Sequence, residues 1–297
     1  MEKEFLKCKL CPRNCNINRY ETLGFCMAPP KIKIAKADLF FYEEPCISGS
    51  NGSGAIFFSH CNLKCIFCQN YEISTNNIGK EITIDKFSDI MINLQNKGAL
   101  NINLVTPTMY IPLIKKGIIK AKEKGLNIPI IYNTSGYENV EALKILDGLI
   151  DVYLPDFKYY NDNLAYKYSN TKNYKETVKS AVDEMYKQTG KITFDKNGII
   201  KKGVIVRHLM LPNMEDDSKK IIEYLYKKYK DNIFLSIMNQ YTVIKPLKYE
   251  ELNKTIEEKV YDDVINYAYD LGIRNAYIQE GGTQKKSFIP DFKNQEF

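Results

Sequence analysis

The sequence lacks any apolar run of the roughly 20 residues that would span a bilayer, so it predicts no transmembrane helix. Its first residues, MEKEFLKCKLC, contain no apolar segment of signal-peptide length, and we therefore expect a cytoplasmic protein. The sequence also lacks internal repeats and low-complexity tracts, which excludes solenoids and disordered scaffolds. A chain of 297 residues is long enough for one large α/β domain or two small ones.

Charge of one sign is not in large excess either. The chain has 42 Lys and Arg residues against 36 Asp and Glu, and this net charge of +6 does not indicate nucleic acid as a partner. Arginine is rare, since only Arg13, Arg19, Arg207 and Arg274 occur. In a chain whose basic residues are mostly lysine, an arginine can mark a position that needs the planar guanidinium group with its several hydrogen-bond donors.

Beyond residue 54 the sequence alternates between apolar strands and amphipathic helices. Strands are expected at 55–60, 101–106, 128–134, 151–157, 203–211, 232–239 and 275–280. Helices are expected from Asp85, as N-cap, to just before Gly98, and at 110–124, 138–147, 173–189, 215–229 and 257–271. Residues 191–200 are expected to form a hairpin that turns at Asn197-Gly198.

This alternation is typical of a parallel sheet covered by helices. Several of the strands end in polar residues: Asn133-Thr134-Ser135, Asp156, Arg207-His208, Asn239-Gln240 and Glu280. In a barrel of parallel strands, the carboxyl ends form the active-site face. We therefore expect an α/β fold, a partial, open parallel barrel of about six strands over residues 55–297, after an irregular Cys-rich extension over residues 1–54.

All eight cysteines lie between residues 8 and 68. In a chain without an export signal, clustered cysteines bind metal or catalyse more often than they form disulfides. Cys61, Cys65 and Cys68 directly follow the first expected strand, and three thiolates on a short loop can hold three irons of a four-iron, four-sulfur cluster. The alternative is an incomplete zinc knuckle that borrows a ligand such as His60.

A second group of cysteines lies near the start of the chain. Cys8, Cys11, Cys15 and Cys26 are a full ligand set for one metal. If the group binds zinc, it is a structural metal site, and if it binds iron and sulfide, it is an auxiliary cluster. The spacing of the cysteines does not decide between the two. Cys46 is left over and is expected to be an ordinary small side chain.

The triplet and its surroundings resemble the radical S-adenosylmethionine (SAM) superfamily, in which an aromatic residue precedes the third cysteine as Phe67 does here. The stretch GSGAIFFSHCNLKCIFCQNYEIS is similar to relatives of the pyruvate formate-lyase activating enzyme. Further segments resemble a poorly characterised branch of these relatives: NINLVTPT, IYNTSGYE, VYLPDFKY, RHLMLPN, MNQYT and IQEGG. The resemblance covers nearly the whole chain, from the CKLCPRNC segment at residue 8 to residues 288–292.

The resemblance implies a [4Fe-4S] cluster on Cys61, Cys65 and Cys68, with SAM chelating the open iron. One electron, from a donor such as flavodoxin or ferredoxin, would then cleave SAM to methionine and a 5′-deoxyadenosyl radical that abstracts a substrate hydrogen. The cofactor carries this chemistry, and the protein positions it and excludes water. Phe67 would pack against adenine. Because this chemistry needs no general base, His60 and His208 are expected to be structural.

Many superfamily members carry a Gly-Gly-Glu-like stretch after the second strand, which binds the methionine amino group. This chain has Thr106-Pro107-Thr108 there, and its carbonyls or hydroxyls could accept the same hydrogen bonds. Other strand ends offer further cofactor contacts. Asn133 and Ser135 match polar positions near the methionine carboxylate or ribose. Asp156 and Lys158 resemble the Asp-x-Lys of activating enzymes, and Arg207 is expected to bind a carboxylate bidentately. The alternative for each is a strand cap or a structural salt bridge.

The function implied by the resemblance is a radical SAM enzyme that activates a partner protein by removing hydrogen from a glycine Cα. A second interpretation keeps the radical chemistry and changes the substrate to RNA, a peptide or a metabolite. A third is a non-catalytic iron–sulfur electron carrier or a metal-stabilised binding module, which would explain the cysteines but not the polar ends of the barrel strands.

Overall fold

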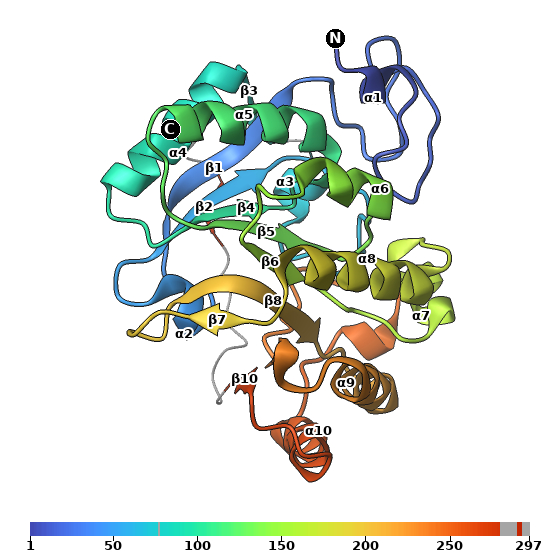
Figure 1. Cartoon of the computed structure of the whole chain (residues 1–297). Helices are drawn as coiled ribbons and strands as arrows, with labels where there is room; N and C mark the ends of the chain where they lie inside the picture. The colour runs from blue at the N-terminus through green and yellow to red at the C-terminus, as the bar shows by residue number, and fades with distance from the viewer. Residues whose placement is uncertain (77, 280–289, 293–297) are drawn as a thin grey trace.

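The computed structural model describes residues 1–76, 78–279 and 290–292. Its described residues form one curved sheet with helices packed against it (Figure 1), in the strand order β10-β9-β8-β6-β5-β4-β2-β1-β3, with β7 paired to β8. The strands are β1 Ile32–Phe40, β2 Ser53–Phe58, β3 Lys80–Ile82, β4 Ile102–Val105, β5 Ile130–Thr134, β6 Val152–Pro155, β7 Thr193–Phe194, β8 Ile200–Leu209, β9 Phe234–Met238 and β10 Ala276–Ile278.

Seven strands lie side by side and each pairs in parallel with the next, in the order β2, β4, β5, β6, β8, β9 and β10. The expected open α/β barrel is therefore confirmed. All residues of β2, β4, β5 and β6 are buried, which explains why these strands read as continuous apolar runs. The register sets Val105 against Asn133 and Asn133 against Leu154, so the carboxyl ends of these strands meet at one edge.

The helices agree closely with the sequence pattern. They are α1 Lys3–Leu6, α2 Pro45–Ser48, α3 Tyr71–Ser74, α4 Ile84–Asn96, α5 Ile111–Glu123, α6 Val140–Leu143, α7 Asp162–Ser169, α8 Tyr174–Thr189, α9 Glu215–Tyr229 and α10 Glu258–Asp270. One expectation is wrong: Thr83, not Asp85, caps α4, because its hydroxyl accepts the Lys86 amide at 3.1 Å. Helix α7 and the three short helices α1, α2 and α3 were not expected.

The expectation that residues 1–54 are irregular is also wrong in part. β1 pairs antiparallel with both β2 and β3 and so extends the sheet beyond the parallel strands. A bulge between Ile34 and Lys36 interrupts the period-two alternation that would have marked β1 in the sequence. The division of the chain at residue 54 remains a prediction.

The hairpin at 191–200 forms as expected, with Gly198 in the left-handed region at φ +77°. The second strand of the hairpin is the first part of β8, which continues without a break to Leu209. β10 ends at Ile278, and the expected site residue Glu280 lies outside the described residues.

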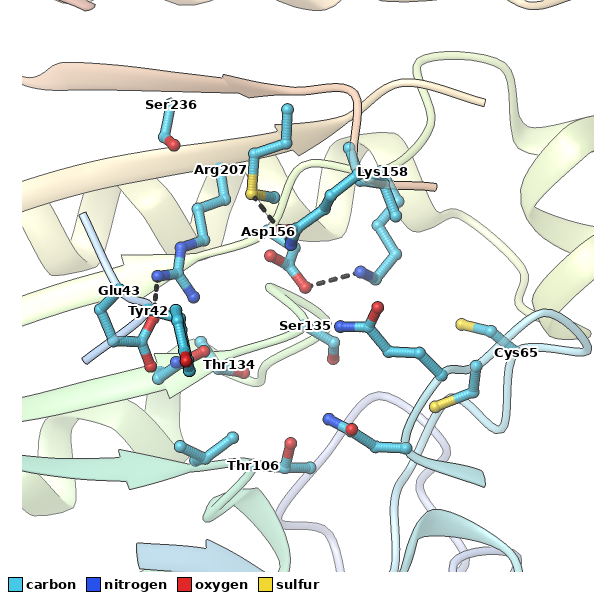
Figure 2. Close-up of a pocket in the computed structure, with 18 of the residues that line it drawn as sticks. Tyr42, Glu43, Cys65, Thr106, Thr134, Ser135, Asp156, Lys158, Arg207 and Ser236 are labelled. Carbon is cyan, nitrogen blue, oxygen red and sulfur yellow. Dashed lines mark hydrogen bonds and ion pairs between the residues drawn. The ribbon is translucent and has the colours of Figure 1, made fainter. Parts of the chain in front are cut away.

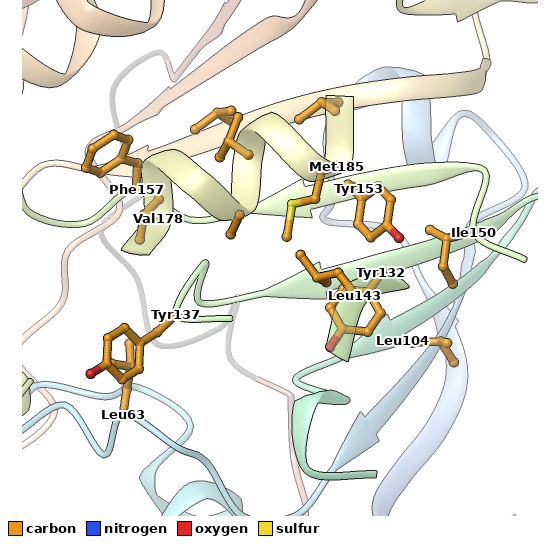
Figure 3. Close-up of a cluster of buried hydrophobic side chains, with 14 of the residues drawn as sticks. Leu63, Leu104, Tyr132, Tyr137, Leu143, Ile150, Tyr153, Phe157, Val178 and Met185 are labelled. Atoms are coloured by element: carbon orange, nitrogen blue, oxygen red, sulfur yellow. The ribbon is translucent and has the colours of Figure 1, made fainter. Parts of the chain in front are cut away.

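Tyrosines fill much of the core between the sheet and its helices. Figure 3 shows Tyr132 and Tyr153 side by side on neighbouring strands, with ring centroids 5.8 Å apart, next to Met185 of α8. The Tyr153 hydroxyl donates to Gln188 Oε1 at 2.5 Å, so this buried polar tip is hydrogen-bonded. No helix within the described residues is long and apolar enough to cross a membrane.

Candidate functional site

A cavity of about 350 Å³ opens at the carboxyl ends of the parallel strands. The residues that the sequence singled out as cluster ligands or cofactor contacts all line it: Cys61, Cys65, Cys68, Phe67, Thr106, Asn133, Ser135, Asp156, Lys158 and Arg207. Figure 2 shows Arg207 and Glu43 at one end, Cys65 at the other, and Asp156 and Lys158 between them. Parallel register brings together residues that are far apart in the chain.

The three cysteines lie on the loop after β2, and each thiol accepts a hydrogen bond. The Leu63 amide donates to Cys61 Sγ at 3.3 Å, the Ser169 hydroxyl to Cys65 Sγ at 3.0 Å, and the Ser74 hydroxyl to Cys68 Sγ at 3.5 Å. Hydrogen bonds to ligand sulfurs stabilise the thiolate form and tune a cluster's reduction potential.

Burial disfavours the ionisation of these three thiols when no metal is bound. It raises the pKa of Cys61 and of Cys65 to about 11, and it raises the pKa of Cys68 as well. Metal binding must therefore release protons, and the positive charge of the metal offsets the cost of three buried thiolates. Among the described residues, no three Cys, His, Asp or Glu side chains gather at one ion-sized point.

Lys158 supplies a positive charge beside the cysteines. Its Nζ lies 2.6 Å from Asp156 Oδ2, with both side chains mostly buried. Burial acts to lower the pKa of Lys158, but attraction to Asp156 and Cys65 outweighs burial and raises it. The Tyr174 hydroxyl fixes this corner from α8: it accepts the Lys158 amide at 3.0 Å and lies 3.1 Å from the carbonyl oxygen of Ser135.

The turn after β4 contains no glycine, yet one of its residues has a backbone conformation that glycine favours. Thr106 has φ +60°, in the left-handed region that β-branched residues rarely adopt. Its amide donates to the Asn133 carbonyl at 2.8 Å, which ties the turn to β5. The side chain of Ser135 is buried and has no hydrogen-bond partner within the described ranges, so its hydroxyl is available to a ligand. Phe67 packs edge-on against Tyr241, with centroids 5.9 Å apart.

Glu138 supports this turn from beneath, and the sequence reasoning missed it. Its Oε1 accepts hydrogen bonds from the hydroxyls of Thr108, at 2.5 Å, and of Thr134. Burial raises the pKa of Glu138 to about 7, although the two hydroxyls act to lower it. The only sequence signal was its place in IYNTSGYE, where an acid after a turn reads as a surface residue.

Arg207 meets side-chain carboxylates rather than an open face of the cavity. Its Nε donates to Glu44 Oε1 at 2.8 Å and its Nη2 to Glu44 Oε2 at 2.5 Å, and Nη2 also contacts Glu43. In the structure, the carboxylate that Arg207 binds bidentately is that of Glu44, the side-chain salt bridge given as the alternative, and a cofactor contact of Arg207 stays a prediction. Both glutamates come from the N-terminal extension, where the sequence analysis had singled out cysteines and arginines but no glutamate.

The N-terminal cysteines also come together. Cys8, Cys11, Cys15 and Cys26 line a cavity of about 20 Å³, which has room for a single ion. Burial raises the pKa of Cys11 and of Cys26, and the neighbouring cysteines of the set add to both shifts.

The remaining candidates are His208, His60 and Cys46. His208 Nδ1 lies 2.8 Å from the Phe157 carbonyl and Nε2 lies 2.8 Å from Ser218 Oγ, which agrees with the structural role expected for it. His60 lines the cavity beside Cys61, and burial lowers its pKa to about 4. Cys46 is buried, as an ordinary small side chain would be.

Comparisons with known proteins agree with this geometry. A model of the Radical SAM superfamily matches residues 55–225. The chain is 31% identical over 284 residues to the uncharacterized protein MJ0674 of Methanocaldococcus jannaschii, covering 88% of this chain and 77% of that protein.

Two solved structures are similar to this chain to different degrees. SuiB of Streptococcus suis, solved bound to S-adenosylmethionine, is 14% identical with a TM-score of 0.51 and covers 75% of this chain. The match spans 48% of SuiB, about half its length. A domain of the pyruvate-formate lyase-activating enzyme from Bacteroides vulgatus is 13% identical with a TM-score of 0.40, covering 59% of this chain and 94% of that domain.

Proposed function

Because the chain belongs to the radical SAM superfamily, we propose that its cavity is the active site in which SAM is cleaved and a substrate hydrogen is abstracted. Cys61, Cys65 and Cys68 would hold the [4Fe-4S] cluster, which supplies the electron that breaks the sulfonium C–S bond. The observation that carries this proposal is that Cys61, Cys65 and Cys68 and every expected cofactor contact line one cavity. An electron carrier would need the cysteines but no cavity of about 350 Å³ beside them.

The chain's own residues prepare this chemistry. Ser169 and Ser74 donate hydrogen bonds to ligand sulfurs, and the ammonium group of Lys158 lies close enough to favour their ionised form. Positive charge and hydrogen bonds near the sulfurs favour the reduced state of the cluster, so they raise its reduction potential. The Ser135 hydroxyl and the backbone of Thr106 would hold the methionine end of SAM, and Phe67 its adenine.

The substrate that we propose is a glycine Cα–H in a partner polypeptide. Tyr42 and Ile278 line the cavity and are nevertheless 60% and 52% exposed, so they stand at its mouth. Exposed apolar side chains around an active-site opening support a macromolecular substrate more than a small polar metabolite. A flavodoxin or ferredoxin would supply the electron.

The test is anaerobic reconstitution with iron and sulfide, followed by reduction in the presence of SAM. We expect 5′-deoxyadenosine and methionine in equal amounts. An intact, reduced cluster without 5′-deoxyadenosine would refute the enzymatic proposal. A glycyl-radical protein encoded beside this one should develop a glycyl radical by electron paramagnetic resonance when mixed with it. Abundant 5′-deoxyadenosine without this signal would refute the glycine substrate alone.

A further inference from the structure

We propose that the N-terminal cysteine segment positions the cluster loop through Arg13, so that metal bound by the N-terminal cysteines orders the site of the catalytic cluster. The inference rests on the proposed function only for the identity of the group that Cys61, Cys65 and Cys68 hold. It makes Arg13 a positioning residue, because its side chain contacts the backbone that carries the ligands rather than the cluster or substrate.

The guanidinium of Arg13 binds four backbone carbonyls on two separate segments. On the cluster loop, Nε donates to the Asn62 oxygen at 2.8 Å and Nη2 to the Leu63 oxygen at 3.4 Å. On the segment that ends α7, Nη2 donates to the Ser169 oxygen at 3.1 Å and Nη1 to the Asn170 oxygen. Only the planar, five-donor fork of arginine can bridge so many acceptors at once.

These two segments hold one of the cluster ligands between them. Asn62 and Leu63 lie between Cys61 and Cys65 in the sequence, and the Ser169 hydroxyl donates to Cys65 Sγ at 3.0 Å. The Ile66 amide also donates to the carbonyl of Tyr168, at 3.0 Å. Arg13 therefore stabilises the contact that fixes Cys65.

The N-terminal cysteines in turn fix Arg13. It stands between Cys11 and Cys15, and its guanidinium lies 3.8 Å from the centroid of Phe25, the residue before Cys26. A Cβ added at Gly24 would lie 2.9 Å from Cys15 Sγ, so the chain packs tightly against this thiol. A metal drawn in by these thiols would lock the backbone on both sides of Arg13.

A second arginine of the same segment acts on another cofactor loop. Arg19 is buried, and its Nη1 donates to the carbonyl of Met109, at 2.6 Å, just after Thr108. Its other donors bind the carbonyls of Ala28, at 3.2 Å, and Pro29, at 2.6 Å. The N-terminal segment thus holds both the cluster loop and the turn after β4.

The test uses amide hydrogen exchange of the full chain without a cluster, read from peptides covering residues 61–66 and 166–171. Arg13→Gln and Arg13→Lys should both exchange there roughly tenfold to a hundredfold faster, because lysine keeps the charge but cannot bridge the carbonyls. The control is Arg274→Gln, since Arg274 is exposed and binds backbone carbonyls far from the site. Unchanged exchange in the Arg13 variants, or an equal change in the control, would overturn the proposal.

Metal dependence is tested in a Cys61/Cys65/Cys68 triple Ala variant, where added Zn²⁺ can bind only at the N-terminal set. Zinc should slow exchange at 61–66 when Arg13 is present and not when it is Gln. No zinc binding, or the same slowing in both backgrounds, would refute the coupling. If Arg13→Gln fails to fold, Arg13→Lys, which keeps the charge, replaces it in both experiments, and the same outcomes support or overturn the proposal. None of these readouts depends on 5′-deoxyadenosine formation, so they fail independently of the proposed function.

Discussion

Replacing Arg207 should destabilise the fold in a way that depends on pH. The two side chains that it holds, Glu43 and Glu44, are nearly inaccessible to solvent, with exposed fractions of 7% and 5%. Arg207→Met would leave two carboxylates buried without a counter-charge. Removing one partner of a buried ion pair costs about 3–5 kcal/mol of the free energy of unfolding. Arg207→Lys keeps one charge but loses the fork, so it should cost about 1.5–3 kcal/mol, the worth of a charged hydrogen bond.

The pH dependence follows from Glu44. Burial acts to raise its pKa, but attraction to Arg207 and hydrogen bonds from Arg207 and Ser236 outweigh burial and lower it. In the wild type, this pair therefore stabilises the fold above the usual pKa of a glutamate, and the stabilisation is lost as pH falls through the lowered pKa. In Arg207→Met the attraction to Arg207 is lost and burial outweighs the remaining hydrogen bonds, such as that from Ser236, so the pKa of Glu44 rises and the variant loses stability as pH increases. The difference between the two proteins should be small near pH 5 and largest near pH 8.

The assay is urea unfolding followed by circular dichroism, under anaerobic reducing conditions, at pH 5.5 and pH 8. Arg274→Met is the matched control, because Arg274 is exposed and should cost less than about 1 kcal/mol at either pH. Equal losses for Arg207→Met at the two pH values would refute the reasoning. So would an Arg207→Lys variant as stable as the wild type.

Three further predictions concern the cysteines and Glu138. Replacing Cys61, Cys65 or Cys68 singly by Ala should abolish 5′-deoxyadenosine formation and lower the iron content, whereas Cys46→Ala should keep both; near-normal turnover in any of the three would disprove the ligand assignment. The Cys61/Cys65/Cys68 triple Ala variant should still bind about one zinc per chain by elemental analysis, and replacing the N-terminal cysteines should remove it; iron in its place would identify an auxiliary cluster. Because the pKa of Glu138 is raised from 4.5 to about 7, wild-type stability should fall as pH rises between these values, by up to about 3 kcal/mol. Glu138→Gln should lack this slope in urea unfolding at pH 5 and pH 8, and an unchanged slope would contradict the assignment.

The parallel half of the molecule could be predicted from the sequence because its signals are local. Each buried strand is a continuous apolar run followed by a polar residue, and parallel pairing forces those polar ends to one edge. Asn133 and Asp156 therefore meet at the cavity although a helix separates their strands. The cysteine triplet could be placed for the same reason, since it directly follows β2.

The contacts that the sequence did not reveal are long-range pairings with no periodic signal. Glu44 and Arg207 are 163 residues apart, and nothing near Glu44 marks it as buried. Thr106 adopts a backbone conformation that glycine favours, and only the folded turn shows it. β1 has the length of a strand, but its bulge breaks the alternation on which strand prediction depends.

Two of these missed features, the Glu44–Arg207 pair and β1, come from the N-terminal extension, and this bears on how the site is built. The N-terminal extension reaches both ends of the cavity: Glu43 and Glu44 neutralise Arg207 at one end, and Arg13 holds the backbone around the cluster loop at the other. β1 also covers the edge of β2, which would otherwise expose unpaired amides and carbonyls directly before the cysteines. Residues 1–54 therefore do more than precede the barrel. The parallel strands bring the candidate cofactor residues together, and the extension supplies the charge balance and the loop contacts that keep them in place.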